Sequence, residues 1–211
     1  EALYAVRRNL AEGAQMEVIV PINEGEVRRI KNGRGNWMTS TDNHPNSAGV
    51  RHLGLTTVDA ANLESYLRDG TGPVLILDAH AHPWLESAAA AAVAASRQAA
   101  VLARYGTPLV DTAQIVMPVA SWAETEGTFT SSTGRVQLTN CAFPPVGQAR
   151  RAWEIVYRLA VDLGIEQERT VTTRILFAEM AAEVAAFSGM TWGRLSAEPG
   201  MPVHEEVVGV G

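Results

Sequence analysis

Residues 73–117, PVLILDAHAHPWLESAAAAAVAASRQAAVLARYGTPLVDTAQIVM, decide the fold of this chain. They open on a continuous apolar run, residues 73–77, which is typical of a central strand covered on both faces. The alanine block at residues 86–98 predicts a helix of low bulk that packs closely on a sheet. Two further strands are expected at residues 99–105 and 113–117. Strand, helix and strand in this order predict a βαβ unit, and with it an α/β fold with a partly parallel sheet flanked by helices.

Helix and strand signals also alternate upstream of this unit. A helix is predicted over residues 1–13, because its apolar residues recur on one face and Gly13 follows them. The β-branched run MEVIVP, residues 16–21, predicts a strand. Another helix is expected over residues 60–68, with Asp59 as its N-cap.

Between these elements, residues 23–48 are rich in Gly, Asn, Ser and Thr and carry few apolar residues. We interpret them as a long loop with a short strand at residues 27–30, and loops of this length usually serve a function or an interface. Trp37 and Met38 lie in this segment, and both residue types are enriched at protein interfaces. We therefore expect residues 31–48 to lie against a neighbouring subunit, with Trp37 as the anchor.

Downstream, the turn residues within residues 127–138 predict a β-hairpin. Two amphipathic helices follow, ending at Gly164 and Gly189. The chain is thus expected to divide into an N-terminal helix, strand and interface loop (1–55), an α/β domain with the hairpin (56–140), and a C-terminal helical segment packed on it (141–211).

Composition excludes several classes of protein. The 211 residues are 46% hydrophobic with a mean hydropathy of −0.01, so the chain can bury a core. With 23 acidic and 17 basic residues the net charge is −6, which argues against a general nucleic-acid binder. A single cysteine, Cys141, excludes an internal disulfide and any all-cysteine metal site. No apolar stretch reaches membrane-spanning length and no signal peptide is visible, so we expect a cytoplasmic protein with no direct membrane insertion. Because the chain starts at Glu1 rather than Met, we also expect a fragment or a processed product.

Few residues point to chemistry on their own. His80 and His82 follow a strand, and two histidines so spaced point to the same side and can share a zinc ion, as at the start of the amidohydrolase barrel. That barrel needs about 250 residues, so a metal-dependent hydrolase is the weaker interpretation and a polar loop at a strand end the stronger. Glu124 and Glu126 could form an acid/base pair, but because they lack a facing partner we interpret them as a solvated helix end. Cys141 is interpreted as a small buried side chain. No phosphate-binding loop and no nucleophile elbow occurs.

Residues 107–164 support a more specific interpretation. They contain DTAQIVMP (111–118), WAETEGTFTSSTGRVQ (122–137) and PPVGQARRAWEI (144–155), and NHPNSAGVRHLGL (43–55) precedes them. In this order the motifs resemble the molybdopterin oxidoreductase superfamily, most of all the large iron–sulfur subunit of bacterial NADH:quinone oxidoreductase, respiratory complex I. The resemblance covers roughly residues 40–195, and it implies the family's α/β domain with a hairpin and C-terminal helices.

The departures from the family pattern matter for the cofactor. The resemblance implies family pocket positions at Asp78, Thr112, Thr130, Gly134 and Arg135. Where the molybdenum enzymes read T-N-x-E-G-R, this chain reads TSSTGR (130–135), and the glycine-led loop near the guanine nucleotide has become DAHAHP (78–83). These changes remove contacts or add bulk, so we expect no cofactor in this chain, and molybdopterin in particular is not expected.

Two functions follow from the resemblance. The first is a non-catalytic, structural subunit or fragment of a complex I-like, NAD-linked redox assembly, peripheral to the inner membrane. Its partners would be the cluster-carrying and NADH-oxidising subunits, which would hold the iron–sulfur clusters and FMN. The alternative is a detached domain of a catalytic bis-guanylate molybdopterin enzyme such as a formate dehydrogenase.

Overall fold

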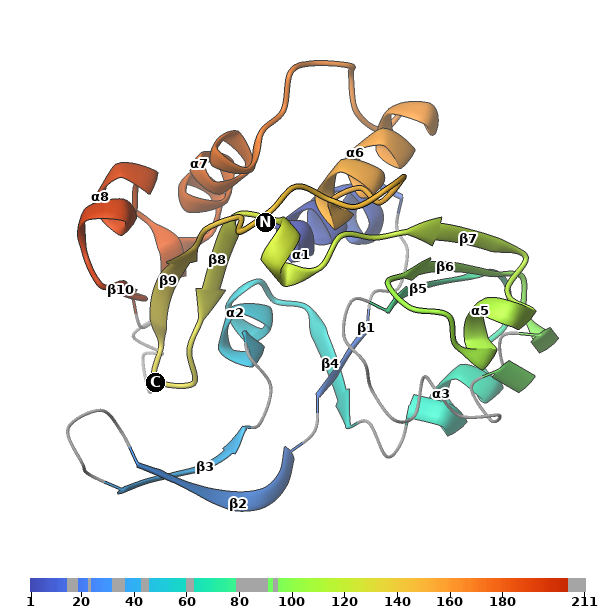
Figure 1. The fold of residues 1–211 in the computed structure, drawn as a ribbon, viewed down its shortest axis with the longest axis horizontal. Coiled ribbons are helices and arrows are strands. Elements are labelled where there is room, and N and C mark those ends of the chain that lie inside the picture. Colours follow the sequence, from blue (N-terminus) through green and yellow to red (C-terminus); the bar gives the residue numbers. More distant parts are fainter. Residues whose placement is uncertain are drawn as a thin grey trace, which may run out of the picture. The chain divides into compact units, whose positions relative to one another are not determined.

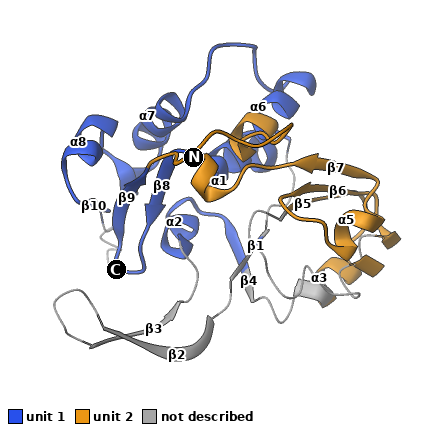
Figure 2. Ribbon diagram, viewed as in Figure 1, with its two compact units in different colours: residues 1–59, 126–139, 156–211 blue, residues 60–125, 140–155 orange. Residues whose placement is uncertain are grey.

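The computed structural model describes residues 1–14, 19–22, 24–31, 37–42, 46–59, 63–78, 91–92 and 95–204 (Figure 1). The chain forms two compact units (Figure 2). Unit 1 comprises residues 1–59, 126–139 and 156–211, and unit 2 comprises residues 60–125 and 140–155. The expected division at residues 55/56 and 140/141 stays a prediction.

Unit 2 is built on a three-stranded parallel sheet in the order β5-β6-β7. The strands are β5 (Val74–Asp78), β6 (Ala99–Ala103) and β7 (Ile115–Pro118). Their register pairs Val74 with Ala99 and Ala100 with Ile115. The predicted strands and the α/β class with a partly parallel sheet are confirmed. Most of the helix predicted over residues 86–98 lies outside the described residues, although 91–92 and 95–96 are helical.

Two short helices accompany this sheet. The helix α5 (Pro108–Thr112), which was not predicted, begins with proline and is capped by the Thr107 side chain, which accepts a hydrogen bond from the Val110 N–H. Its Leu109 is fully buried in the core cluster with Ala99, Val101 and Ala103. The helix predicted over 60–68 is confirmed as α3 (Leu63–Asp69). Asp59 as its N-cap is wrong, because Asp59 is instead the last residue of a strand and the helix begins later.

Unit 1 begins with α1 (Ala2–Val6) and continues as a π-helix, η1 (Arg7–Gly13), so the predicted helix over 1–13 is confirmed with a wider second half. A parallel pair follows, formed by β1 (Ile19–Ile22) and β4 (Thr56–Asp59), with α2 (Ser47–His52) before β4. Tyr4, Ala5 and Leu10 are almost completely buried, so this helical stretch contributes to the core of unit 1.

The long loop predicted over residues 23–48 is wrong for its described part, whereas the short strand predicted at residues 27–30 is confirmed as part of a longer strand. The described part of this segment forms an antiparallel pair, β2 (Glu24–Lys31) and β3 (Trp37–Asp42), in which Ile30 pairs with Met38 and Lys31 with Trp37. Backbone hydrogen bonds build such a ladder without an apolar alternation in the sequence, so the polar composition did not reveal it.

A second antiparallel sheet of unit 1 has the order β10-β9-β8. It comprises β8 (Gly127–Thr130), β9 (Arg135–Thr139) and β10 (Met201–Pro202), so the predicted hairpin is confirmed. Gly134 has φ +70° at the turn, where glycine avoids the strain of a side chain. The predicted C-terminal helices are confirmed as α6 (Ala152–Asp162) and α7 (Thr173–Glu183), although α7 ends before the predicted end at Gly189. The 3₁₀-helix η4 (Ala185–Phe187) and the helix α8 (Trp192–Ala197) follow.

In the part of the chain that the structure describes, no helix combines the length and the apolar character needed to cross a membrane.

Candidate functional site

The family pocket positions fall in both units. Thr130, Gly134 and Arg135 lie together at the turn of the β8–β9 hairpin in unit 1. Asp78 is the last residue of β5, and Thr112 is the last residue of α5, both in unit 2. The hairpin turn therefore brings three of the five predicted positions together.

The hairpin turn is closed by its own hydroxyl groups. Ser131 Oγ and Thr133 Oγ1 are 2.9 Å apart and hydrogen-bonded, and the Arg135 N–H donates to Ser131 Oγ at 3.1 Å. The Ser131 N–H donates to the Arg135 carbonyl oxygen at 2.9 Å. Ser131 and Thr133 occupy the positions at which the molybdenum enzymes' motif has Asn and Glu, so these two side chains serve the turn itself.

Asn46 supports the start of the turn, although the sequence alone did not single it out. Its Oδ1 atom accepts a hydrogen bond of 2.8 Å from the Thr130 N–H, and Thr130 is buried. Asn46 has φ +74°, a left-handed conformation that Asn tolerates better than most residues. A Cβ atom on Gly49 would clash with the Asn46 side chain, so this glycine makes room for the contact. The signal was the NHPNSAG segment, in which Asn46 follows a proline.

Arg135 ties the hairpin to the C-terminal strand. Its Nη2 atom donates to the Gly200 carbonyl oxygen at 2.8 Å, just before β10 pairs with β9 at Met201 and Val136. Gly200 has φ +118°, and a Cβ atom there would lie 2.8 Å from the Val136 carbonyl oxygen. Arg135 therefore has a structural task in unit 1 whatever else it contacts.

In unit 2, Asp78, Ala103 and Pro118 are register partners at the carboxyl ends of the three parallel strands. Such an end is where open α/β sheets bind ligands. The Thr112 hydroxyl donates to the carbonyl oxygens of Pro108 and Leu109, each at 3.1 Å, and so it is engaged within its own helix. His80 and His82 lie outside the described residues, and the residues that are described hold no cluster of His, Cys, Asp and Glu suited to a metal ion.

The interpretation of Glu124 as a solvated helix end is wrong. Glu124 is buried and ends a short 3₁₀-helix, η3 (Trp122–Glu124). Its Oε2 atom accepts from the Ser121 N–H at 2.7 Å, and its Oε1 atom from the Val146 N–H at 3.0 Å. The Ser121 N–H bond, followed by the Ser121 hydroxyl bond, lowers the pKa of Glu124 below its ordinary value of 4.5. This carboxylate holds residues 121–124 against the loop at residue 146.

Two other expectations concern single side chains. Cys141 is exposed, and its thiol donates to the Phe143 carbonyl oxygen at 3.1 Å, so its assignment as a buried side chain is wrong. Trp37 and Met38 are placed on β3, opposite Lys31 and Ile30. Their role at an interface stays a prediction.

These contacts bear on the molybdopterin cofactor that the family resemblance implies. At the turn, the two substituted side chains bond each other instead of extending outward as longer Asn and Glu side chains could. The Thr112 hydroxyl is likewise engaged with its own helix. Positions 131 and 133 therefore depart from the family's cofactor motif, whereas Thr130, Gly134 and Arg135 match its T, G and R.

Comparison with known proteins gives the relationships of the chain. The assimilatory nitrate reductase catalytic subunit of Bacillus subtilis is 34% identical over 42% of this chain. An F420-dependent formate dehydrogenase alpha subunit of Methanococcus maripaludis is 36% identical over 44% of it. A subunit of the NADH-quinone oxidoreductase of Pseudomonas putida is 30% identical over 69% of it. The chain spans less than a fifth of the length of these relatives, namely 13%, 16% and 16%.

The sequence model of the molybdopterin oxidoreductase family matches residues 31–161, which is more than half of the chain. The match includes the parallel sheet of unit 2, the β8–β9 hairpin and most of α6. This chain belongs to the molybdopterin oxidoreductase family.

Proposed function

We propose that this chain is a non-catalytic, structural part of a complex I-like NADH:quinone oxidoreductase, in which it supports the electron-transfer arm. The extent of similarity carries the proposal. The NADH-quinone oxidoreductase subunit of Pseudomonas putida aligns with 69% of the chain, whereas the nitrate reductase and formate dehydrogenase subunits align with 42% and 44%. Similarity that extends past the shared motifs favours the relationship to the NADH-quinone oxidoreductase subunit.

The contacts of the hairpin turn support the absence of a molybdenum cofactor. The side chains of a cofactor motif must offer hydrogen-bond donors and acceptors to the cofactor, and bonds within the turn use the same atoms. Ser131 and Thr133 bond each other, Arg135 donates to Gly200, and Asn46 accepts from Thr130. Each of these contacts explains the residue at its position by a role in the fold of unit 1.

Partners and location follow from the same proposal. A supporting domain of this kind would pack beside cluster-carrying and NADH-oxidising subunits, which would hold the iron–sulfur clusters and FMN. Its place would be cytoplasmic and peripheral to the inner membrane, through the complex. The single cysteine of this chain is consistent with clusters held elsewhere, because those clusters are bound by several cysteines.

A second candidate is a domain of a catalytic molybdopterin enzyme of the formate dehydrogenase type. Three F420-dependent formate dehydrogenase alpha subunits, from two methanogens, are 36–37% identical over 39–44% of the chain. That identity is higher than the 30% for the NADH-quinone oxidoreductase subunit, although it covers less of the chain.

Purification of the tagged chain from membranes and cytosol of its native host distinguishes the two functions. The proposal predicts co-purification with flavin- and cluster-containing subunits and NADH-dependent reduction of ferricyanide by the assembly. Formate- or nitrate-dependent turnover of the purified assembly, with stoichiometric molybdenum, would establish the second candidate and reject the first.

A motif-restoring variant provides the matched control. The double substitution Ser131→Asn and Thr133→Glu recreates the T-N-x-E-G-R pattern in this chain. If the chain is structural, the variant assembles like the wild type and gains no molybdenum. If the wild type is a cofactor-binding domain, molybdenum is present before the substitution, and retention rises after it.

A further inference from the structure

Large apolar side chains are exposed unevenly over this chain. In the described residues, six of the seven exposed ones belong to unit 2, and only Leu163 belongs to unit 1. Those of unit 2 are Tyr105, Ile115, Val116, Trp122, Phe143 and Val146. Exposed apolar residues that gather in one region mark interaction sites more often than scattered ones do.

Strand β7 is the clearest part of this region. Ile115 is 57% exposed and Val116 is 42% exposed, whereas Val101 and Leu102 on the adjacent β6 are almost completely buried. Successive residues of a strand point to opposite faces, so both faces of the sheet are open at β7. Strands of parallel sheets are normally covered on both faces and read as apolar runs. Figure 1 shows β7 at the edge of the three-stranded sheet, with β6 on its inner side.

The outer edge of β7 already pairs with a backbone segment at one end. The Arg150 N–H donates to the Pro118 carbonyl oxygen at 3.2 Å, and the Ala120 N–H donates to the Arg150 carbonyl oxygen at 2.8 Å. This bridge, between Val119 and Arg150, is parallel. In the described part of the chain it stops there, and no strand is paired with residues 115–117 on that side. An added strand beside 115–117 would extend a ladder that has begun.

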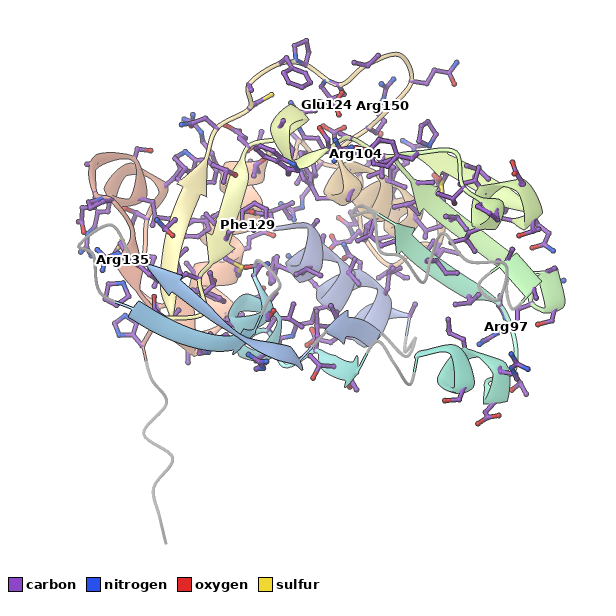
Figure 3. The ribbon with its side chains drawn as sticks, turned by 60° about the horizontal axis from the view of Figure 1, so that its bottom comes forward. Arg97, Arg104, Glu124, Phe129, Arg135 and Arg150 are labelled. Atoms are coloured by element: carbon purple, nitrogen blue, oxygen red, sulfur yellow. The ribbon has the colours of Figure 1, made fainter. Side chains whose placement is uncertain are left out.

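Two arginines lie at the same end of β7, and one of them, Arg104, also interacts electrostatically with the Glu124 carboxylate. Arg150 is exposed, and its Nη1 atom donates to the carbonyl oxygen of the adjacent Ala149. Arg104 follows β6 and stacks on the Tyr105 ring, 4.7 Å from its centroid. Figure 3 shows Arg104 and Arg150 in the same region as Glu124. Both carboxylate oxygens of Glu124 accept hydrogen bonds from backbone N–H groups.

We propose that the outer edge of β7 binds an extended strand of a partner polypeptide, apolar along residues 115–117 and carrying a carboxylate beside Arg104 and Arg150. Main-chain hydrogen bonds of such strand addition supply affinity, and side-chain contacts supply specificity. Trp122, Tyr105 and Arg150 are exposed in this unit, and Trp, Tyr and Arg are the residue types that contribute most to the binding energy of interfaces. The proposal holds for either function considered above.

Fluorescence anisotropy with labelled peptides tests the edge directly. The probe is a peptide of about eight residues, alternating Val and Thr and ending in two Glu residues. One comparison peptide ends in two Lys residues, and another has a central Pro, which removes a ladder donor. We expect the acidic peptide to bind about tenfold more tightly than either, with slowed hydrogen exchange at Val116, whose N–H faces the outer edge of β7.

Charge reversal separates this contact from unspecific adhesion. Arg150→Glu should weaken the acidic peptide about tenfold and strengthen the lysine peptide, without touching the sheet core. Arg158→Glu is the matched control, because Arg158 is an exposed arginine of unit 1 and its reversal should leave both affinities unchanged. Circular dichroism confirms that both variants remain folded.

Three outcomes would overturn the proposal. One is binding of the proline peptide as tightly as the acidic one, and another is no binding of any peptide. The third is a dimer of the chain in sedimentation without peptide that Ile115→Lys dissociates, because the edge would then be occupied by a second copy.

Discussion

Arg97 illustrates how single polar side chains close the turns of this fold. Its guanidinium donates to three carbonyl oxygens, those of Gly72 at 2.8 Å, Leu67 at 3.0 Å and Thr71 at 3.2 Å. These acceptors lie at the end of α3 and in the turn before β5, 25 to 30 residues earlier in the chain. A Cβ atom on Gly70 would lie 2.7 Å from Nη1, so the turn leaves room for the guanidinium.

Arg97→Ala should therefore lower the free energy of unfolding by about 1–3 kcal/mol, because three backbone acceptors lose a charged donor. Arg97→Lys should restore only part of this, since a lysine ammonium cannot span three acceptors as the planar fork does. Urea unfolding measures both. The control is Arg158→Ala, whose partners Asp162 and Glu168 are exposed, with an expected cost of about 0–1 kcal/mol. Equal losses in Arg97→Ala and Arg158→Ala would contradict the structural role.

Glu124 predicts a pH dependence of stability. Its bonds from Ser121 and Val146 lower its pKa in the folded chain below 4.5, so its stabilising contribution is complete above that pH and is lost as the pH falls through the folded pKa. Glu124→Gln should cost about 1–2 kcal/mol at neutral pH. The difference in the free energy of unfolding between Glu124→Gln and the wild type should become smaller below pH 4.5. Urea midpoints from neutral to acid pH test this, and Glu168→Gln, at an exposed carboxylate, serves as the control. A stability difference between Glu124→Gln and the wild type that stays constant at acid pH would refute this role of Glu124.

At the residue level the sequence predicted less than at the level of elements. The hairpin turn and its Gly134 were predictable, because the residue types of a turn indicate its backbone conformation from the local sequence alone. The role of Glu124 was missed although Ser121 and Glu124 form a capping box, a pattern that the sequence carries locally. Its second bond, from the Val146 N–H, and the Asn46 bond from the Thr130 N–H join residues far apart in the chain and could not be predicted. Cys141 was judged by the usual burial of cysteine, and its local bond to Phe143 at the surface could not be anticipated.

Among the elements, those with a strong local pattern were predicted. The apolar runs of β5 and β6 and the amphipathic α6 follow periodicities that burial imposes. Of the β2–β3 pair only a short strand at residues 27–30 was predicted, because both strands are polar and their pairing is a backbone property. The Thr107-Pro108 start of α5 was a readable signal, since Pro at the first helical position after a Thr cap is typical of helix starts.

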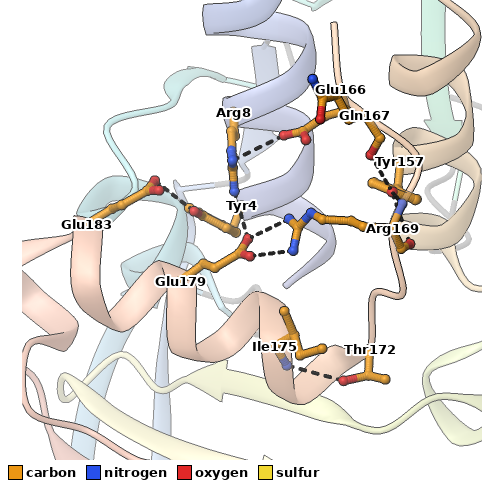
Figure 4. A network of polar contacts seen from close by, with 10 residues as sticks. All are labelled: Tyr4, Arg8, Tyr157, Glu166, Gln167, Arg169, Thr172, Ile175, Glu179 and Glu183. Atoms are coloured by element: carbon orange, nitrogen blue, oxygen red, sulfur yellow. Dashed lines mark hydrogen bonds and ion pairs between the residues drawn. The ribbon is translucent and has the colours of Figure 1, made fainter.

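A polar network fixes the π-helix η1 to α7 in unit 1 (Figure 4). Arg8 pairs with Glu179 at 2.6 Å and with Glu166 at 3.2 Å, and Arg169 pairs with Glu179 at 2.7 Å. Tyr4 donates to Glu183 at 2.7 Å, and burial, followed by this bond, raises the pKa of Tyr4 well above its ordinary value. Glu179 is thus shared by two arginines that come from different segments.

Glu179→Gln should lower the free energy of unfolding by about 1–2 kcal/mol, because two partly buried guanidinium groups lose a common carboxylate. The matched control is Glu198→Gln, whose partner Arg194 is more exposed, with a cost of at most about 0.5 kcal/mol. Thermal unfolding at low ionic strength measures both. Should the two variants melt alike, the network would be a surface feature without structural weight.

The β2–β3 pair is where the sequence predicts a contact with a neighbouring subunit. A two-stranded pair is marginally stable in water by itself, so packing against another surface would stabilise it. Trp37→Ala should weaken assembly by about 2 kcal/mol, in the range of interface hot spots, and leave the chain folded. Co-purification of the variant with its complex and a thermal melt of the free chain decide this. If Trp37→Ala assembles as well as the wild type but the free chain melts at a much lower temperature, Trp37 is a core residue and not an interface anchor.

At the scale of the whole molecule, the sequence motifs and the family match indicate the same family. The parallel sheet, the hairpin and α6 fall within the family match at residues 31–161. Of the pocket positions that the family resemblance names, Thr112 bonds within its own helix. Ser131 and Thr133, which lie between the pocket positions Thr130 and Gly134, bond each other. A shared fold does not by itself imply a shared chemistry.

Metal content is the decisive property of the molecule as a whole. The isolated chain should be colourless and contain far less than one atom of iron, molybdenum or zinc, because one cysteine cannot hold a cluster and the turn residues bond each other. Elemental analysis of chain produced in cells supplied with all three metals measures this. If zinc is found at about one atom per chain, His80→Ala and His82→Ala should each abolish it, since both imidazoles would be ligands. Stoichiometric molybdenum or zinc would reject the structural role, because a subunit that only supports the electron-transfer arm has no use for either metal.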